Sequence, residues 1–302
     1  GRVSPMQELQ MTTVLDPNIH NLAIEGTFDD AQAIVKALFN DQDFKKKYYL
    51  GSVNSINWAR ILAQIVYYFY AWFQVAKDDS EQVSFVVPTG NFGNVLAGYY
   101  AKRMGLPIDK LVIGTNENDI LHRFFSKGEY HRTELKETYS PSMDIQISSN
   151  FERYLFDLAG NSAEKLQHWM EEFDRSGKLT IEGELLKIAQ KDFVSARVGD
   201  EEIVRTIRNF HQQTGYLLDP HTAVGVNAAE KTDIQTPVIC LACAHPAKFG
   251  ETIRKALGAE PELPEELAVL ENMETNCKTL PAVTESIKNE ILETLEAQSI
   301  TP

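Results

Sequence analysis

The chain has 302 residues, of which 43% are hydrophobic and 10% aromatic, enough for a packed core in one large domain or two smaller ones. Its 43 acidic and 29 basic residues give a net charge of −14, which argues against a nucleic-acid-binding or anionic-membrane surface. Only three cysteines occur, with no second Cys or His pair of the kind a structural zinc needs. We therefore expect a globular protein of a reducing, cytoplasmic compartment, with no metal site and no transmembrane or signal segment.

The first quarter of the chain predicts two helices around one strand. Residues 5–14 are typical of a helix and residues 21–24 of a strand. A helix follows over about residues 28–39, with acidic side chains in its first turn, where they complement the helix dipole.

The next segment alternates regularly between helix and strand. The patterns predict a helix over residues 56–73, a buried strand over 83–87, a helix over 94–104 and a strand over 110–114. Such alternation is typical of βαβ units with helices flanking a parallel sheet. The sequence therefore predicts an α/β fold with mainly parallel sheets flanked by helices.

The remaining residues are less regular. Residues 116–149 are polar and turn-rich, which indicates irregular or lid-like structure, and helices then dominate to about residue 214. Asp219 is a good helix N-cap because a proline follows it at the first helical position. Residues 238–243 predict a buried strand, and residues 260–281 an acidic surface crossing before a last helix with one apolar stripe.

A glycine loop lies between the predicted strand and helix at residues 88–94, Pro-Thr-Gly-Asn-Phe-Gly-Asn. A strand that delivers such a loop to a helix N-terminus points unpaired backbone N–H groups and the helix dipole at one place, which suits a phosphate ester. Gly90 and Gly93 allow close approach, and Asn91 and Asn94 add amide donors. The alternative is a turn in which glycine serves only its backbone freedom. No nucleotide fingerprint is present, so the phosphate would belong to a cofactor or a small substrate.

Polar residues on the helix over 56–73 form a second candidate surface. Asn57, Arg60 and Gln64 fall at helical spacings of three and four, so one face presents amides and a guanidinium to an anionic substrate. The alternative is that Asn54 or Ser55 caps the helix while Arg60 makes a structural ion pair.

Two histidines and a cysteine near predicted element ends are further candidates. His221 and His245 are as compatible with structural contacts as with a ligand, since proton transfer needs geometry that sequence does not supply. Cys243, close to His245, closes an apolar strand and is more typical of a packing residue than of a nucleophile. We reject Lys248 as a Schiff-base lysine.

Six separated segments, in one order along nearly the whole chain, carry a family resemblance. They are residues 1–8 (GRVSPMQE), 53–64 (VNSINWARILAQ), 88–94 (PTGNFGN), 115–119 (TNEND), 219–225 (DPHTAVG) and 244–249 (AHPAKF). Together they resemble threonine synthase in the longer form found in fungi and many bacteria. Six segments in register are much more specific than any one motif.

The resemblance implies a fold-type II pyridoxal-phosphate enzyme, similar to the tryptophan synthase β chain, acting as a monomer or homodimer. Its reaction converts O-phosphohomoserine and water to threonine and phosphate, by γ-elimination followed by β-addition of water. Cys243 stands where the family usually has a Thr that meets the pyridine nitrogen, and a thiol is the weaker partner. The residues that the resemblance assigns to the cofactor are Gly90, Asn91, Phe92, Gly93, Asn94 and Cys243. Those for the substrate are Ser55, Asn57 and Arg60.

The resemblance also implies that the chain is the C-terminal part of the enzyme. The family's Schiff-base lysine lies upstream in a Phe-Lys-Asp segment, with a Ser-Gly-Asp-Thr-Gly loop, and residues 1–302 contain neither sequence. We therefore expect no catalytic lysine in this chain, and no activity from the chain alone. Residues 1–55 would be the remainder of a small cofactor-side domain. Residues 56–302 would form the large domain, with a mostly helical insertion over about 116–214.

Two alternatives remain open. The first is a non-catalytic threonine synthase-like protein that keeps the fold for binding or signalling, which the cysteine at position 243 and the expected loss of the lysine both motivate. The second is a serine/threonine dehydratase or another β-replacing fold-type II enzyme. This second alternative is weaker because residues 54–60 and 219–225 do not resemble that branch.

Overall fold

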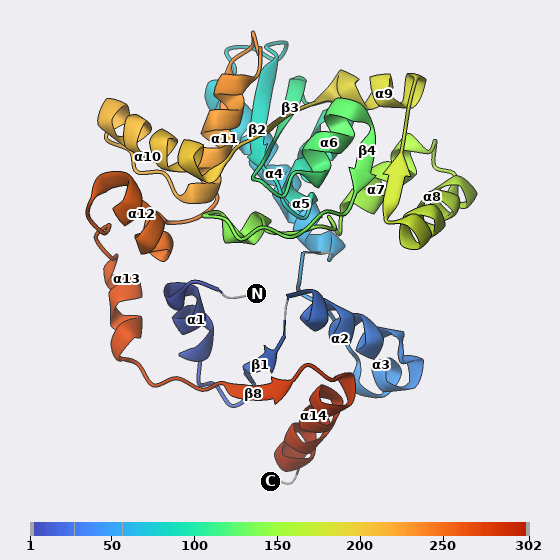
Figure 1. Ribbon diagram of the computed structural model, residues 1–302, viewed down its shortest axis with the longest axis vertical. Coiled ribbons are helices and arrows are strands. Elements are labelled where there is room, and N and C mark those ends of the chain that lie inside the picture. The colour runs from blue at the N-terminus through green and yellow to red at the C-terminus, as the bar shows by residue number, and fades with distance from the viewer. Residues whose placement is uncertain (1–2, 27, 56, 300–302) are drawn as a thin grey trace. The chain divides into compact units, whose positions relative to one another are not determined.

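The computed structural model describes residues 3–26, 28–55 and 57–299, and it divides into two compact units (Figure 1). One unit joins Gly1–Ser52 to Glu262–Pro302, and the other is Val53–Pro261. The residues after 261 were predicted to belong to the large domain, whereas their contacts group them with the first 52 residues. Gly1, Arg2 and Ile56, which belong to the segments of family resemblance, lie outside the described residues.

The larger unit is built on a four-stranded sheet in the order β6-β3-β2-β7. Its strands are β2 (Val83–Pro88), β3 (Ile108–Thr115), β6 (Phe193–Arg197) and β7 (Val238–Cys240). Every neighbouring pair is parallel, which confirms the predicted α/β fold. The central strands β2 and β3 are buried along most of their length because both of their faces are covered.

Helices cover both faces of this sheet, and alternate residues of the strands face the two layers. Phe85 and Val87 belong to a core with the helices α4 to α9, whereas Val86 and Val112 belong to a second core with α10 to α12. The helices of this unit are α4 (Trp58–Val75), α5 (Gly93–Arg103), α6 (Ile120–Lys127), α7 (Phe151–Leu158), α8 (Ala163–Ser176), α9 (Glu184–Asp192), α10 (Asp200–Thr214), α11 (Pro220–Lys231) and α12 (Gly250–Leu257).

The prediction of irregular structure over residues 116–149 is partly wrong. The helix α6 and the strand β4 (Glu129–His131) lie inside this range, and β4 pairs antiparallel with β5 (Lys178–Thr180). The helix forms because Leu121, Phe124 and Phe125 lie on one face and enter the main core, which outweighs the polar composition. The rest, residues 132–149, is irregular apart from the 3-10 turn η1 (Pro141–Met143).

The predicted strand over residues 238–243 is too long, since β7 ends at Cys240. After the backbone N–H of Leu241 bonds to Val86, the chain leaves the sheet, and the N–H of Cys243 bonds to the Thr222 hydroxyl instead. The 3-10 turn η2 (Pro246–Phe249) follows. An apolar run therefore marks the strand, but hydrogen bonding to α11 decides where it ends.

The smaller unit is built around the parallel pair β1 (Leu22–Glu25) and β8 (Lys278–Pro281). Its core contains Ile34, Leu38, Phe44 and Ile287. Its helices are α1 (Pro5–Thr12), α2 (Phe28–Asn40), α3 (Gln42–Tyr48), α13 (Glu265–Ala268), the 3-10 turn η3 (Val269–Asn272) and α14 (Thr284–Ser299). In the described part of the chain no helix combines the length and apolarity needed to cross a bilayer.

Candidate functional site

A cavity of about 970 Å³ lies in the larger unit, at the carboxyl ends of β2 and β7. Ligands of open α/β sheets collect at this edge. Its walls come from the loop between β2 and α5, from one side of α4, and from residues 241–243. The cavity brings together the predicted site residues Ser55, Arg60, Gly90, Asn91, Phe92, Gly93, Asn94 and Cys243. Asn57 is the one predicted site residue that does not line it.

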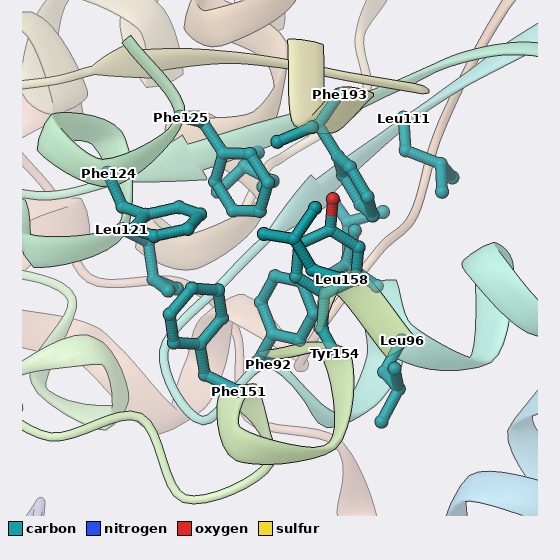
Figure 2. Packing of buried hydrophobic residues seen from close by; sticks show 14 of the residues in the cluster. Phe92, Leu96, Leu111, Leu121, Phe124, Phe125, Phe151, Tyr154, Leu158 and Phe193 are labelled. Carbon is teal, nitrogen blue, oxygen red and sulfur yellow. The ribbon is translucent and has the colours of Figure 1, made fainter. Parts of the chain in front are cut away.

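The loop is anchored by the ring of Phe92. This residue adopts a left-handed conformation, with φ of 62°, and its side chain is only 1% exposed. The ring packs between aromatic side chains of the main core, with centroids 5.3 Å from Phe151 and 5.9 Å from Phe125 (Figure 2). Because the ring is buried in the core, the backbone of Phe92 is the part that remains available to a ligand.

The backbone donors of this loop are free. Thr89 makes the last sheet bond, from its N–H to the Gly114 carbonyl at 2.8 Å. Among the described residues, the N–H groups of residues 90–93 find no acceptor, and α5 begins at Gly93 with no side-chain cap. Unpaired N–H groups and the positive end of a helix dipole together form an anion site. The geometry therefore supports the predicted phosphate position.

The opposite wall is formed by α4 and the residues before it. Arg60 is exposed, and its Nη1 donates to the Val53 carbonyl at 3.0 Å. Asn57 is the N-cap of α4, where its Oδ1 accepts from the N–H of Ala59 at 2.9 Å. The capping alternative that the sequence left open named Asn54 or Ser55, whereas the structure has Asn57 as the cap.

Gln64 lines the cavity one helical turn after Arg60. Its Oε1 is buried and has no hydrogen-bond partner among the described residues. A buried amide oxygen without a partner is unfavourable, so a ligand donor at this place would satisfy it. The sequence pattern placed Gln64 on the polar helix face but did not include it among the site residues, because helical spacing does not reveal which polar atoms remain unpaired.

Cys243 lies at the edge of the cavity, beyond the end of β7. Its side chain is exposed to the cavity, yet the surrounding protein desolvates the sulfur and raises the pKa of the thiol to about 12, assisted by the Asp219 carboxylate. The thiol therefore stays neutral near pH 7, and it is neither an anion nor an activated nucleophile. Its S–H is a weak donor, and the sulfur lies 3.8 Å from the Leu241 carbonyl oxygen.

Asp219 organises the wall behind Cys243. It caps α11, and its Oδ1 accepts from the N–H and the Nδ1 of His221, each at 2.9 Å. Its Oδ2 accepts from the Thr222 hydroxyl and, at 3.3 Å, from the N–H of Ala244. Burial alone would raise the pKa of Asp219, but the hydrogen bonds from His221 and Thr222 outweigh it and lower this pKa.

Both candidate histidines make structural contacts. His221 is buried, and its Nε2 accepts from the N–H of Ser142 at 3.2 Å, so its proton lies on Nδ1 toward Asp219. His245 caps η2 through its Nδ1, which accepts from the N–H of Ala247. Neither histidine lines the cavity. His221 does, however, accept a hydrogen bond from Ser142, which lines it.

Comparison with known proteins points to one family. A family model described as "Threonine synthase, C-terminal" matches residues 222–291. Threonine synthase of Schizosaccharomyces pombe is 51% identical over 286 residues, which cover 86% of this chain and 56% of that protein. Threonine synthase of Pseudomonas aeruginosa is 50% identical, over 93% of this chain and 60% of that protein. The chain thus spans less than two thirds of the length of these relatives.

The fold gives the same result. The crystal structure of PLP-bound threonine synthase from Brucella melitensis superposes with a TM-score of 0.89 at 46% identity, covering 97% of this chain and 63% of that one. The predicted fold-type II architecture is therefore confirmed. Since sequence, fold and the separated motifs agree over nearly all of its residues, the chain belongs to the threonine synthase family.

Proposed function

We propose that this chain is the cofactor-phosphate-binding and substrate-binding part of a threonine synthase that converts O-phosphohomoserine and water to threonine and phosphate. The observation that carries the proposal is the row of unpaired N–H groups at residues 90–93, at the start of α5 and inside the cavity. The related Brucella protein is described as PLP-bound. We propose pyridoxal phosphate as the cofactor here as well.

The donor set of the loop fits this cofactor. The N–H groups of residues 90–93 would hold its phosphate, and the apolar side chains of Ile61 and Leu241 in the same cavity suit its ring. A β-carbon added at Gly90 would lie 3.1 Å from the Ser142 carbonyl oxygen, so glycine is needed where the loop passes that residue. When bound, pyridoxal phosphate supplies an electron sink for carbanions at the α and β carbons of the substrate.

The thiol of Cys243 is proposed to face the pyridine nitrogen, where the resemblance places a Thr hydroxyl. A neutral thiol donates weakly and does not stabilise a positive charge, so it suits an unprotonated nitrogen. Burial of the sulfur keeps its proton in place throughout the physiological range.

The substrate side of the proposal rests on Ser55 and Arg60. The exposed guanidinium of Arg60 has donors beyond the one bound to Val53, and these suit the phosphate or carboxylate of O-phosphohomoserine. The net charge of −14 repels an anionic substrate, so the positive charge of Arg60 at the cavity matters more for binding it. A substrate contact of Asn57 stays a prediction.

The first test uses the purified 302-residue protein. We expect it to quench pyridoxal-phosphate fluorescence reversibly, with inorganic phosphate competing, but to release no phosphate from O-phosphohomoserine. Absence of cofactor binding would contradict the proposed site. Borohydride trapping of the cofactor on one lysine of the 302-residue protein, together with turnover, would contradict the predicted inactivity. A longer protein that binds the cofactor tightly but also lacks turnover would favour the non-catalytic alternative.

A cytoplasmic location and a monomeric or homodimeric state are further parts of the proposal. Cell fractionation and sedimentation of the purified protein test them independently of the chemistry.

A further inference from the structure

The glycine loop is held from behind by residues 148–150, which lead into α7. The Ser148 hydroxyl donates to the Gly90 carbonyl at 2.8 Å. The backbone N–H and the Nδ2 of Asn150 both donate to the Asn91 carbonyl at 3.1 Å, and the Ser149 hydroxyl donates to Asn91 Oδ1 at 3.2 Å. Ser148 and Asn150 are buried, so these bonds do not compete with bulk water.

The helix side of the loop is held by Tyr68 from α4. Its hydroxyl oxygen lies 2.8 Å from the Asn94 carbonyl oxygen and 3.0 Å from Asn94 Oδ1. Gly98 allows this approach, because an added β-carbon would lie 2.5 Å from the Tyr68 ring. Burial raises the pKa of Tyr68 well above its ordinary value, so the hydroxyl keeps its proton and remains a donor.

All of these hydrogen bonds run in the same direction, with the loop as the acceptor. At Gly90, Asn91 and Asn94 they engage carbonyl or amide oxygens of the loop, and in every case the partner is the donor. The peptide N–H points away from its neighbouring carbonyl, and the amide nitrogen of an asparagine lies opposite its oxygen. With the oxygens engaged behind the loop, its free groups are donors.

We propose that Ser148, Asn150 and Tyr68 are positioning residues that set the loop as a donor-only cradle, which selects ligands carrying an acceptor-only phosphate group. This inference rests on the proposed function, since it explains how the same loop distinguishes a phosphorylated ligand from its dephosphorylated form. None of the three residues lines the cavity, so they act through the loop and not by touching the ligand.

Asn150 also connects two of the walls of the cavity. Its Nδ2 donates to the Ser55 carbonyl at 2.9 Å as well as to the Asn91 carbonyl, and its Oδ1 accepts from Arg153. The phosphate cradle and the start of the α4 wall therefore share one buried amide. We expect its replacement to affect ligands that use either wall.

The test compares two ligands that differ only in the phosphate. Affinities for pyridoxal phosphate and for pyridoxal are measured by fluorescence titration for the wild type, Ser148→Ala, Tyr68→Phe and Asn150→Ala. For Ser148→Ala and Tyr68→Phe we expect the phosphorylated ligand to bind about three- to tenfold more weakly, the loss typical of one hydrogen bond, and pyridoxal to be unaffected. Ser148→Thr, which keeps the hydroxyl, should restore binding.

Ser84→Ala is the matched control. Ser84 is a fully buried serine at the opposite end of β2, with its hydroxyl bonded to Thr236, so it reports the effect of losing a buried hydroxyl elsewhere. In Ser148→Ala, equal losses for both ligands or no loss at all would overturn the positioning roles while leaving the site intact. A wild-type protein that binds neither pyridoxal phosphate nor inorganic phosphate would instead overturn the proposed function itself. If Tyr68→Phe does not fold, Ser148→Ala still decides the outcome.

Discussion

Two of the three walls of the cavity, the glycine loop and α4, are built in different ways. The glycine loop offers backbone N–H groups. The Phe92 ring packs into the aromatic core, and carbonyl oxygens of the loop accept hydrogen bonds from residues behind it. The α4 wall offers side chains, and several remain open to solvent: Val66, Tyr67 and Tyr70 are 62%, 54% and 67% exposed. A backbone cradle fixed by a packed core is preorganised, whereas exposed side chains gain fixed positions only when a ligand or a partner covers them. Recognition of phosphate should therefore depend on packing, and recognition of the rest of the ligand on individual side chains.

Gly90→Val is the strongest way to break the preorganised wall. The added side chain would meet the Ser142 carbonyl at 3.1 Å and Met143 Cα at 3.3 Å, so the loop must shift. We expect pyridoxal phosphate to bind at least about a hundredfold more weakly, roughly 3 kcal/mol, measured by fluorescence titration. Gly51→Val is the control, because no atom lies within 4 Å of a β-carbon there. Equal losses in both variants would contradict the steric explanation.

Asp219→Asn should weaken the support behind the wall that carries Cys243. We expect a loss of about 2–3 kcal/mol in the free energy of unfolding near pH 7, since a buried carboxylate accepts several hydrogen bonds. The folded pKa of Asp219 is lowered, so its contribution is full above the ordinary Asp value of about 3.9 and disappears as the pH falls through the folded pKa.

Urea unfolding between pH 2 and 7 checks both parts of this prediction. The stability difference between wild type and Asp219→Asn should shrink toward the acid end. Asp174→Asn is the control, because Asp174 is exposed and its closest basic atom, of Arg132, lies 4.0 Å away; it should change stability by less than about 0.5 kcal/mol. A difference independent of pH would show that the charge of Asp219 is not what stabilises the wall.

Cys243 belongs to the third wall, formed by residues 241–243, and Cys243→Thr tests that wall. Because a hydroxyl is a better donor than a thiol, we expect pyridoxal phosphate to bind about threefold more tightly. In the wild type, the pKa of about 12 predicts that iodoacetamide at pH 8 labels exposed Cys277 well before Cys243. Peptide mass spectrometry measures both sites in one sample. Equal labelling rates would contradict the desolvated thiol.

Asn57→Ala tests the α4 wall, where we expect no change in ligand affinity. Loss of the cap should cost about 1 kcal/mol of stability, the usual value for an N-cap. If Asn57 only caps the helix, affinity for inorganic phosphate and for pyridoxal phosphate should not change. Asn57→Ser, which keeps a capping oxygen, should restore stability. A clear loss of substrate affinity in both variants would instead support the predicted substrate contact.

The local signals along the chain were reliable where neighbouring residues decide the structure. The strand over 83–87, its glycine loop and the helix start near residue 94 are confirmed within a residue or two. Asp219 caps a helix that has proline in its first turn, as predicted. The predictions for residues 120–131 and 241–243 were wrong, because burial in the core and a hydrogen bond to Thr222 outweighed local composition there.

The family could be predicted from six separated segments, and the alternation of strands and helices and the glycine loop from local patterns, because each segment and each pattern consists of neighbouring residues. The strand order β6-β3-β2-β7, the pairing of β1 with β8 and the hydrogen bonds from residues 148–150 behind the loop became known only from the folded chain. The tertiary structure also decided that Asn57 caps a helix while Gln64 faces the cavity with an unpaired oxygen. These features depend on contacts between segments that are distant in the chain, and such contacts form only once the core has packed.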